Sequence, residues 1–171
     1  MSHCIKEMTL DLKDYIEGGT VFRRNAVRGI VRRKDRYLVI YGKYGDYNFP
    51  GGGMKEGEEL LDTLIREVQE ETGYKVIPES VTDYFLVHER RKGTIDDLFE
   101  MDSWYFFCQV EETMYERALE DYEVEYDYQT AWMPLGDVIQ KNEAVKDHEK
   151  IPWILREIMI MRELYALGDN T

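Results

Sequence analysis

The chain has little cysteine, little proline and no long hydrophobic run. Of its 171 residues, two are cysteine and four are proline. Cys4 and Cys108 lie far apart, which does not match the spacing of a disulfide framework or a zinc motif and favours two reduced thiols. No apolar stretch approaches the ~18 residues of a membrane-spanning helix, and no charged-then-apolar leader opens the chain. We therefore expect a cytoplasmic protein without a membrane partner.

Positive charge is also scarce. The sequence holds 35 Asp and Glu against 22 Lys and Arg, which gives a formal net charge of −13. This balance argues against a duplex nucleic-acid partner, because the phosphate backbone would be repelled. An acidic protein can still act on small phosphate compounds where metal ions mask the local charge.

The charge is unevenly distributed along the chain. Residues 23–43 hold eight Arg and Lys against Asp35 alone, and residues 111–127 hold eight Asp and Glu against Arg117 alone. The basic segment could present a cation to a substrate phosphate, and Arg28 is the candidate. The alternative is that these cations are solvated strand and turn residues.

The pattern of apolar residues and turn signals predicts one α/β domain with a mixed sheet between helices. We expect strands at residues 26–31, 36–41, 84–88, 103–110 and 130–133. We expect helices over residues 58–72, over about eight residues from Pro134, and from Pro152 to a stop at Gly168. The polar segment 89–100 is predicted to be a hairpin loop. Residues 1–20 are an N-terminal extension, in which 9–16 form a strand or a loose arm, and residues 21–171 form the domain. The expected buried face of the last helix consists of Ile154, Ile158, Met161 and Tyr165.

The helix predicted over residues 58–72 carries three carboxylates on one face. At about 100° per residue, Glu67, Glu70 and Glu71 fall within roughly 100° of each other, where like charges repel. A divalent cation removes this repulsion, and hard oxygen ligands suit Mg²⁺ or Mn²⁺. The alternative is a solvated acidic face. The adjacent apolar stripe, which we expect to pack on the sheet, consists of Leu61, Leu64, Ile65 and Val68.

A run of glycines precedes this helix. The segment Pro50-Gly51-Gly52-Gly53 lets the backbone approach a ligand closely and adopt positive φ. We therefore regard Gly52 and Gly53 as candidate substrate-binding residues, and a carbonyl of this loop could complete a metal shell. A flexible turn without a ligand is the alternative.

Residues 52–74 resemble the Nudix box, the signature of the MutT-like Nudix hydrolases. Its pattern is G-x5-E-x7-R-E-U-x-E-E-x-G-U, where U is a bulky aliphatic residue. Gly52, Glu58 and the run from Arg66 to Gly73 fill every fixed position. Only Tyr74 departs, and we expect this aromatic residue to pack the end of the helix. A weaker resemblance extends over residues 24–167.

The resemblance implies the Nudix fold, an α/β fold with a mixed sheet between helices. It also implies a Mg²⁺-dependent or Mn²⁺-dependent pyrophosphohydrolase that uses water to cleave a nucleoside diphosphate linked to another group. The metal would be held by Glu67, Glu70 and Glu71, and the carbonyl of Gly51 would join them.

The resemblance also assigns roles to residues that do not bind the metal. Glu58 and Arg66 would hold the loop and the carboxylates in place, although a capping role in the first helical turn remains an alternative for Glu58. A further acid outside the box acts as the base in many relatives. Glu123 is the first candidate here, Glu125 and Asp127 are the others, and a solvated acidic loop is the alternative for each.

Two other classes of function stay open. One is an enzyme like isopentenyl diphosphate isomerase, which shares the fold and needs a catalytic cysteine. The other is a non-catalytic Nudix module that only binds a nucleotide or a partner. The sequence does not indicate the substrate, because residues 89–92 carry neither the proline of ADP-ribose hydrolases nor the tyrosine of diadenosine polyphosphate hydrolases. The oligomeric state is also open, with a homodimer as one option.

Overall fold

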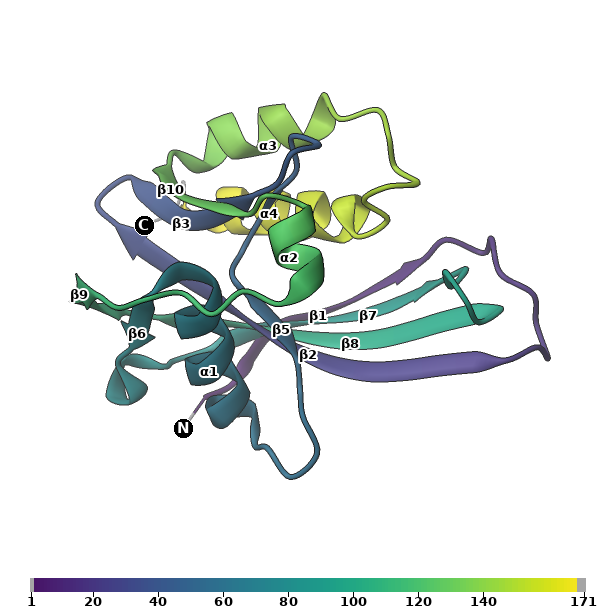
Figure 1. Ribbon diagram of the computed structural model, residues 1–171, viewed down its shortest axis with the longest axis horizontal. Coiled ribbons are helices and arrows are strands. Elements are labelled where there is room, and N and C mark those ends of the chain that lie inside the picture. Colours follow the sequence, from purple (N-terminus) through teal and green to yellow (C-terminus); the bar gives the residue numbers. More distant parts are fainter. Residues whose placement is uncertain (1, 169–171) are drawn as a thin grey trace.

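A computed structural model describes residues 2–168. Within that range, eight strands form a mixed sheet in the order β1-β7-β8-β2-β3-β10, with β5 paired to β2 and β4 to β3. The strands β6 and β9 form a separate pair, and helices cover both faces of the sheet (Figure 1). The strands are β1 Cys4–Asp11, β2 Val21–Arg33, β3 Arg36–Tyr41, β4 Tyr47–Asn48, β5 Gly51–Gly53, β6 Tyr74–Val76, β7 Tyr84–Arg91, β8 Leu98–Cys108, β9 Val110–Met114 and β10 Gln129–Met133. The helices are α1 Leu60–Thr72, the short 3-10 helix Pro78–Ser80, α2 Asp121–Glu125, α3 Leu135–Glu143 and α4 Ile154–Gly168.

Strand β2 is the centre of the sheet and separates two hydrophobic cores. It runs parallel to β8 along its length and antiparallel to β5 and β3. Because successive side chains of a strand point to opposite faces, Val27 and Val31 pack with α1, whereas Ile30 packs with α3 and α4. The predicted α/β architecture with a mixed sheet between helices is confirmed.

Helix α1 has clear start and stop signals. Glu59 caps its N-terminus in a reciprocal capping box with Asp62, and Gly73 ends it in the left-handed conformation at φ 81°. The helix packs so closely on β2 that a Cβ added to Gly29 would lie 3.2 Å from the Val68 side chain. After the helix, Tyr74 is buried and packs edge-on against a tryptophan, as expected. This close packing fixes α1 beside the glycine run of β5.

Two residues predicted for buried helix faces are exposed. Leu61 is 39% exposed and Tyr165 is 49% exposed. In α1 the buried face includes the carboxylates Glu67 and Glu71, so the helix is rotated away from the stripe that hydrophobicity alone selects. The last helix begins at Ile154 instead of Pro152, and it extends to Gly168, the last residue that the structure describes.

The hairpin predicted over residues 89–100 is wrong in extent. Strand β7 continues to Arg91 and β8 begins at Leu98, so the connecting loop spans residues 92–97. The polar residues Glu89 and Arg91 are buried strand positions, which an alternation of apolar residues cannot reveal.

The N-terminal residues contain a strand that joins the sheet. Strand β1, Cys4–Asp11, pairs in parallel with β7 at one edge, so a strand is present but lies earlier than residues 9–16. The division into an extension and a domain from residue 21 stays a prediction. Together β1, β7, β8 and β2 extend well beyond the helices (Figure 1).

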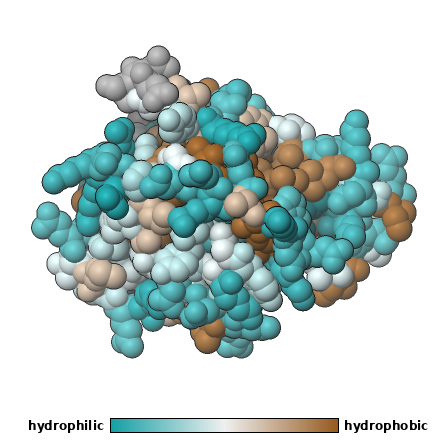
Figure 2. Space-filling view, turned by 90° about the horizontal axis from the view of Figure 1, so that it is seen from above, coloured by the Kyte–Doolittle hydropathy of each residue, from teal (hydrophilic) through white to brown (hydrophobic). Residues whose placement is uncertain are grey.

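The surface agrees with the charged composition. Seen from above, it is mostly hydrophilic, with one larger hydrophobic group from the upper centre to the right of the view and a few smaller groups elsewhere (Figure 2). Among residues 2–168, no helix combines the length and the apolar character that a membrane crossing requires.

Candidate active site

Arg66 of α1 connects the glycine loop with the acidic face of the helix. Its Nε and Nη2 donate to the two carboxylate oxygens of Glu58 at 2.5 and 2.9 Å, and Nη2 also donates to the Gly53 carbonyl at 3.0 Å. Its Nη1 donates to Glu67 at 2.7 Å and to Glu70 at 3.2 Å. The planar guanidinium thus uses its donors to fix four groups.

Glu58 lies just before the helix and is not its cap, because Glu59 occupies that position. The Glu58 carboxylate accepts hydrogen bonds from Arg66, from the Lys55 backbone and from the Thr63 hydroxyl. The hydrogen bonds from Arg66 are the main reason that the pKa of Glu58 falls to about 2. Glu58 is therefore a charged anchor between the loop and α1, and the capping alternative is wrong.

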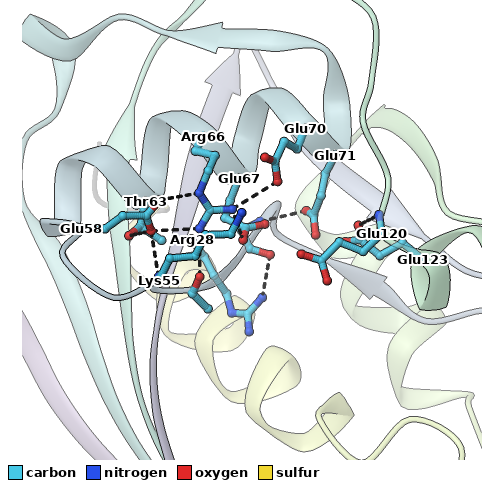
Figure 3. Close-up of polar contacts among 12 residues, drawn as sticks. Arg28, Lys55, Glu58, Thr63, Arg66, Glu67, Glu70, Glu71, Glu120 and Glu123 are labelled. Carbon is cyan, nitrogen blue, oxygen red and sulfur yellow. Dashed lines mark hydrogen bonds and ion pairs between the residues drawn. The ribbon is translucent and has the colours of Figure 1, made fainter.

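Three carboxylates converge in front of Arg66. Glu67 and Glu70 of α1 meet Glu120, which precedes α2, and each offers an oxygen within 4.8 Å of the others. Figure 3 shows Glu120 facing the helix from the opposite segment. Burial raises the pKa of Glu67, while the hydrogen bond from Arg66 opposes that rise. Converging hard oxygens with mutual repulsion fit Mg²⁺ or Mn²⁺.

Glu71 belongs to a second, more deeply buried group. It is 2% exposed, and its Oε2 accepts a hydrogen bond from the Gly51 backbone at 2.9 Å. Burial raises the pKa of Glu71 well above its ordinary value, and the neighbouring Glu123 carboxyl raises it further. The Gly51 carbonyl accepts from Arg28 Nη1 at 3.4 Å. The residues predicted as one metal set are thus divided between two adjoining groups.

Of the three acids considered as the base, the structure brings Glu123 to the site. Glu123 is 2% exposed in α2, and its Oε1 accepts a hydrogen bond from the Glu120 backbone at 2.7 Å. Glu125 and Asp127 are exposed to solvent. Sequence reasoning missed Glu120, although the local signal exists: Glu120 and Glu123 form a capping box with the spacing E-x-x-E.

A cavity of about 210 Å³ adjoins these carboxylates. Its acid end is lined by Gly51, Gly52 and Glu71. A Cβ on Gly52 would lie 2.6 Å from the Glu67 carboxylate, and one on Gly53 would lie 2.5 Å from Arg24 Nη2. A side chain at either position would displace the Glu67 carboxylate or the Arg24 guanidinium from its place in the site. Four arginines line the remaining wall, and they are Arg24, Arg28, Arg91 and Arg156.

Arg28, the predicted substrate-binding cation, lies in this cavity wall. Its side chain is 11% exposed, and its Nε is 4.0 Å from the nearest Glu157 oxygen. Sequence reasoning did not identify Arg91 or Arg156, because they come from β7 and α4 and no local motif connects them with Arg28.

Comparison with known proteins agrees with this geometry. Nudix hydrolase 6 of Arabidopsis thaliana is 30% identical over 97 residues, which cover 57% of this chain and 31% of the relative. The chain thus spans about a third of that plant protein. An RNA pyrophosphohydrolase of Psychrobacter sp. (strain PRwf-1) is 26% identical over 161 residues, which cover 84% of this chain and 90% of the relative.

Solved structures support the fold. A NUDIX hydrolase from Nitrosomonas europaea superimposes with a TM-score of 0.58 at 22% identity, covering 86% of this chain and 90% of that one. The model of the family described as NUDIX domain matches residues 22–154. Since that match spans most of the chain and includes the whole segment that builds the acid site, the chain belongs to the Nudix family.

Proposed function

We propose that the chain is a metal-dependent pyrophosphohydrolase that cleaves a nucleoside diphosphate linked to another group. The observation that carries this proposal is the convergence of Glu67, Glu70 and Glu120 beside a cation-lined cavity. Mg²⁺, with Mn²⁺ as a substitute, fits these oxygens. When bound, it would neutralise phosphate charge, acidify water and stabilise the leaving oxygen. Action on a small nucleotide in the cytoplasm is part of this proposal.

The residues around the carboxylates have separate roles in this proposal. Glu67, Glu70 and Glu120 would hold the metal. Arg66 and Glu58 fix the position of the glycine loop relative to α1. Gly52 and Gly53 leave space for the diphosphate to approach the carboxylates, because side chains there would displace the Glu67 carboxylate or the Arg24 guanidinium.

Glu123 is our candidate for the base that removes a proton from the attacking water. Its carboxyl lies in contact with Glu71, and both side chains are buried beside the metal-binding carboxylates. Glu71 also holds the Gly51 backbone N–H, which fixes the start of the glycine run. In this assignment Glu71 positions the glycine loop and Glu123, and the metal is held by Glu67, Glu70 and Glu120 instead of by Glu71.

The other two classes of function have less support. An isomerase of this fold needs a cysteine in the cleft, but neither cysteine lines the cavity beside the carboxylates. Cys108 is buried in the core under α1, and burial raises the pKa of its thiol to about 12. A module that only binds ligand has no need for the complete set of box glutamates, which this chain retains.

The direct test is hydrolysis of a panel of nucleoside diphosphate derivatives with millimolar Mg²⁺. Released phosphomonoesters are converted to free phosphate by a coupled phosphatase, and parallel reactions contain EDTA. We expect Mg²⁺-dependent release from at least one panel member. Release that is equal in EDTA, or no release with either Mg²⁺ or Mn²⁺, would contradict the proposal.

A further inference from the structure

The four arginines of the cavity are not neutralised by the acids around them. Arg156 is 2% exposed, and it donates to Glu89 at 3.1 and 3.3 Å and to the Tyr105 hydroxyl at 2.9 Å. Glu157, also buried, lies 3.5 Å from Arg156 and 4.0 Å from Arg28. Arg28, Arg91 and Arg156 therefore share two buried carboxylates on this side of the cavity, and Arg24 pairs with neither. The four guanidinium groups outnumber these two carboxylates, so this wall carries excess positive charge in a strongly acidic protein.

Two of these arginines have unused hydrogen-bond donors. Arg91 is 8% exposed, its Nε lies 3.6 Å from Glu89, and its guanidinium lies over the Phe99 ring at 4.1 Å. The Nε atoms of Arg91 and Arg28 are buried, and neither has a hydrogen-bond partner among the described residues. A buried guanidinium whose charge is poorly compensated is costly, so an anion bound in the cavity that both side chains line would stabilise the site.

Arg24 lies at the same wall and has no acidic hydrogen-bond or ion-pair partner among residues 2–168. Its side chain is exposed at the cavity, where partial desolvation and then charge repulsion from Arg28 lower its pKa. Its neighbour Arg23 differs, because it is 76% exposed and pairs with Glu100 at 2.6 Å. The alternation of β2 therefore directs one arginine to the cavity and the other to solvent.

We propose that this cavity binds a phosphoryl group of the substrate that is additional to the diphosphate undergoing cleavage. The inference rests on the proposed function for the position of the diphosphate. Phosphate matches the forked donors of arginine, which bind its oxygens in pairs. The cavity volume of about 210 Å³ is below the range of roughly 300–1,000 Å³ for whole-ligand pockets, so it fits one part of a ligand.

The position of the cavity suits this role. Gly51, Gly52 and Glu71 line it next to the carboxylates, so a diphosphate there would extend directly toward the arginines. At its other end, Arg91 and Thr94 also line a neighbouring cavity of about 500 Å³, which leaves room for the remainder of the ligand. The additional phosphoryl group is either a third member of the phosphate chain or a phosphate on the linked group.

Binding without turnover tests the proposal. Calorimetry in EDTA, with inorganic tripolyphosphate as the probe, should detect binding to the wild type. Arg24→Gln and Arg91→Gln should each weaken it by about tenfold, which is typical for loss of one charge-assisted contact. Arg23→Gln is the matched control and should change affinity by less than about twofold. Arg24 is on the surface of the cavity, so its variant stays informative if Arg91→Gln folds poorly.

A kinetic arm separates the two sources of the phosphoryl group. We measure kcat/KM for a nucleoside triphosphate and for a nucleoside diphosphate sugar with an additional phosphate on its sugar. Each value is divided by kcat/KM for the nucleoside diphosphate sugar that lacks the additional phosphate. Arg24→Gln should lower the ratio for the true class of substrate by about tenfold. The compound whose ratio falls identifies the source.

Failure of this inference differs from failure of the proposed function. Absence of tripolyphosphate binding to the wild type, or equal affinity in Arg23→Gln, Arg24→Gln and Arg91→Gln, would overturn the phosphoryl site. If Arg24-dependent binding is observed but no panel compound is hydrolysed, the site stands and the hydrolase proposal fails.

Discussion

The acid site and the arginine cavity adjoin each other but are assembled in opposite ways. Most of the acid site comes from one continuous segment, in which Arg66 donates hydrogen bonds to Glu58, Glu67 and Glu70. The cavity takes its arginines from β2, β7 and α4, which are far apart in the sequence. A local motif therefore records the first region, whereas only the sheet register and the packing of α4 create the second.

The two regions also have opposite electrostatic needs. Converging carboxylates need a cation, and partly unpaired guanidinium groups need an anion. A substrate with several phosphates, together with a bound divalent cation, satisfies both needs at once. Variants of the acid site are therefore expected to lower turnover, whereas variants of the arginine cavity are expected to change which substrate is accepted.

The largest effect is expected on the acid side, at Glu70. Glu70→Gln keeps the shape of the side chain but removes a charge from the group of Glu67, Glu70 and Glu120. Turnover of the best panel substrate should fall by about a hundredfold to a thousandfold, because charge stabilisation in the transition state is lost. Steady-state kinetics and a thermal melt measure activity and folding. Near-normal turnover of a folded Glu70→Gln protein would refute the assignment, and exposed Glu56→Gln serves as control.

A slightly smaller effect is expected at the border between the two regions, where Glu123 contacts Glu71. Glu123→Gln should lower turnover by about a hundredfold with little change in metal affinity, since a base acts on water and not on the metal. Glu125→Gln and Asp127→Asn, both exposed, should have small effects at saturating Mg²⁺. If Asp127→Asn is instead the damaging variant, the base is a different residue.

The same contrast explains what could be predicted from the sequence. The helix, its stop at Gly73 and the shared face of Glu67 and Glu70 follow from residue spacing alone. The E-x-x-E spacing of Glu120 and Glu123 indicates a helix start but not a place in the site, because the approach of Glu120 to α1 depends on the path of the chain after β9. The extent of the hairpin around Arg91 differs for a related reason: buried polar strand residues break the hydrophobic alternation, and their partners are distant or polar, with Glu89 paired to Arg156 of α4 and Arg91 paired to Glu89.

Thermal stabilisation by metal should show which carboxylates of the acid site bind the ion. At about ten times its dissociation constant, Mg²⁺ should raise the Tm of the wild type by roughly 3–5 °C, because it binds the folded state. Glu120→Gln should abolish most of this shift, whereas exposed Glu125→Gln, at the far end of the helix that Glu120 caps, should retain it. A shift that survives Glu120→Gln but is lost in Glu71→Gln would restore the ligand set implied by the family resemblance.

The smallest effect is expected on the face of β7 opposite to the one that carries Glu89 and Arg91. His88 of β7 lies between Glu7 of β1 and Asp102 of β8, with Asp102 Oδ1 2.6 Å from Nδ1. Both contacts raise the pKa of His88 above its ordinary value, and the contact with Glu7 contributes most. The protonated form is favoured in the folded state, so this stabilisation is complete below the unfolded pKa of about 6.5 and disappears as pH rises through the folded pKa.

Urea denaturation at several pH values tests this expectation with His88→Gln. The wild type should lose stability relative to the variant as pH rises above about 6.5. The difference should stay below about 1 kcal/mol, because the side chain is 33% exposed and solvent screens its ion pairs. The acid site should be unaffected, so turnover at a fixed pH should match the wild type. A free energy of unfolding with the same pH dependence in both proteins would show that the two carboxylates do not hold a charged His88.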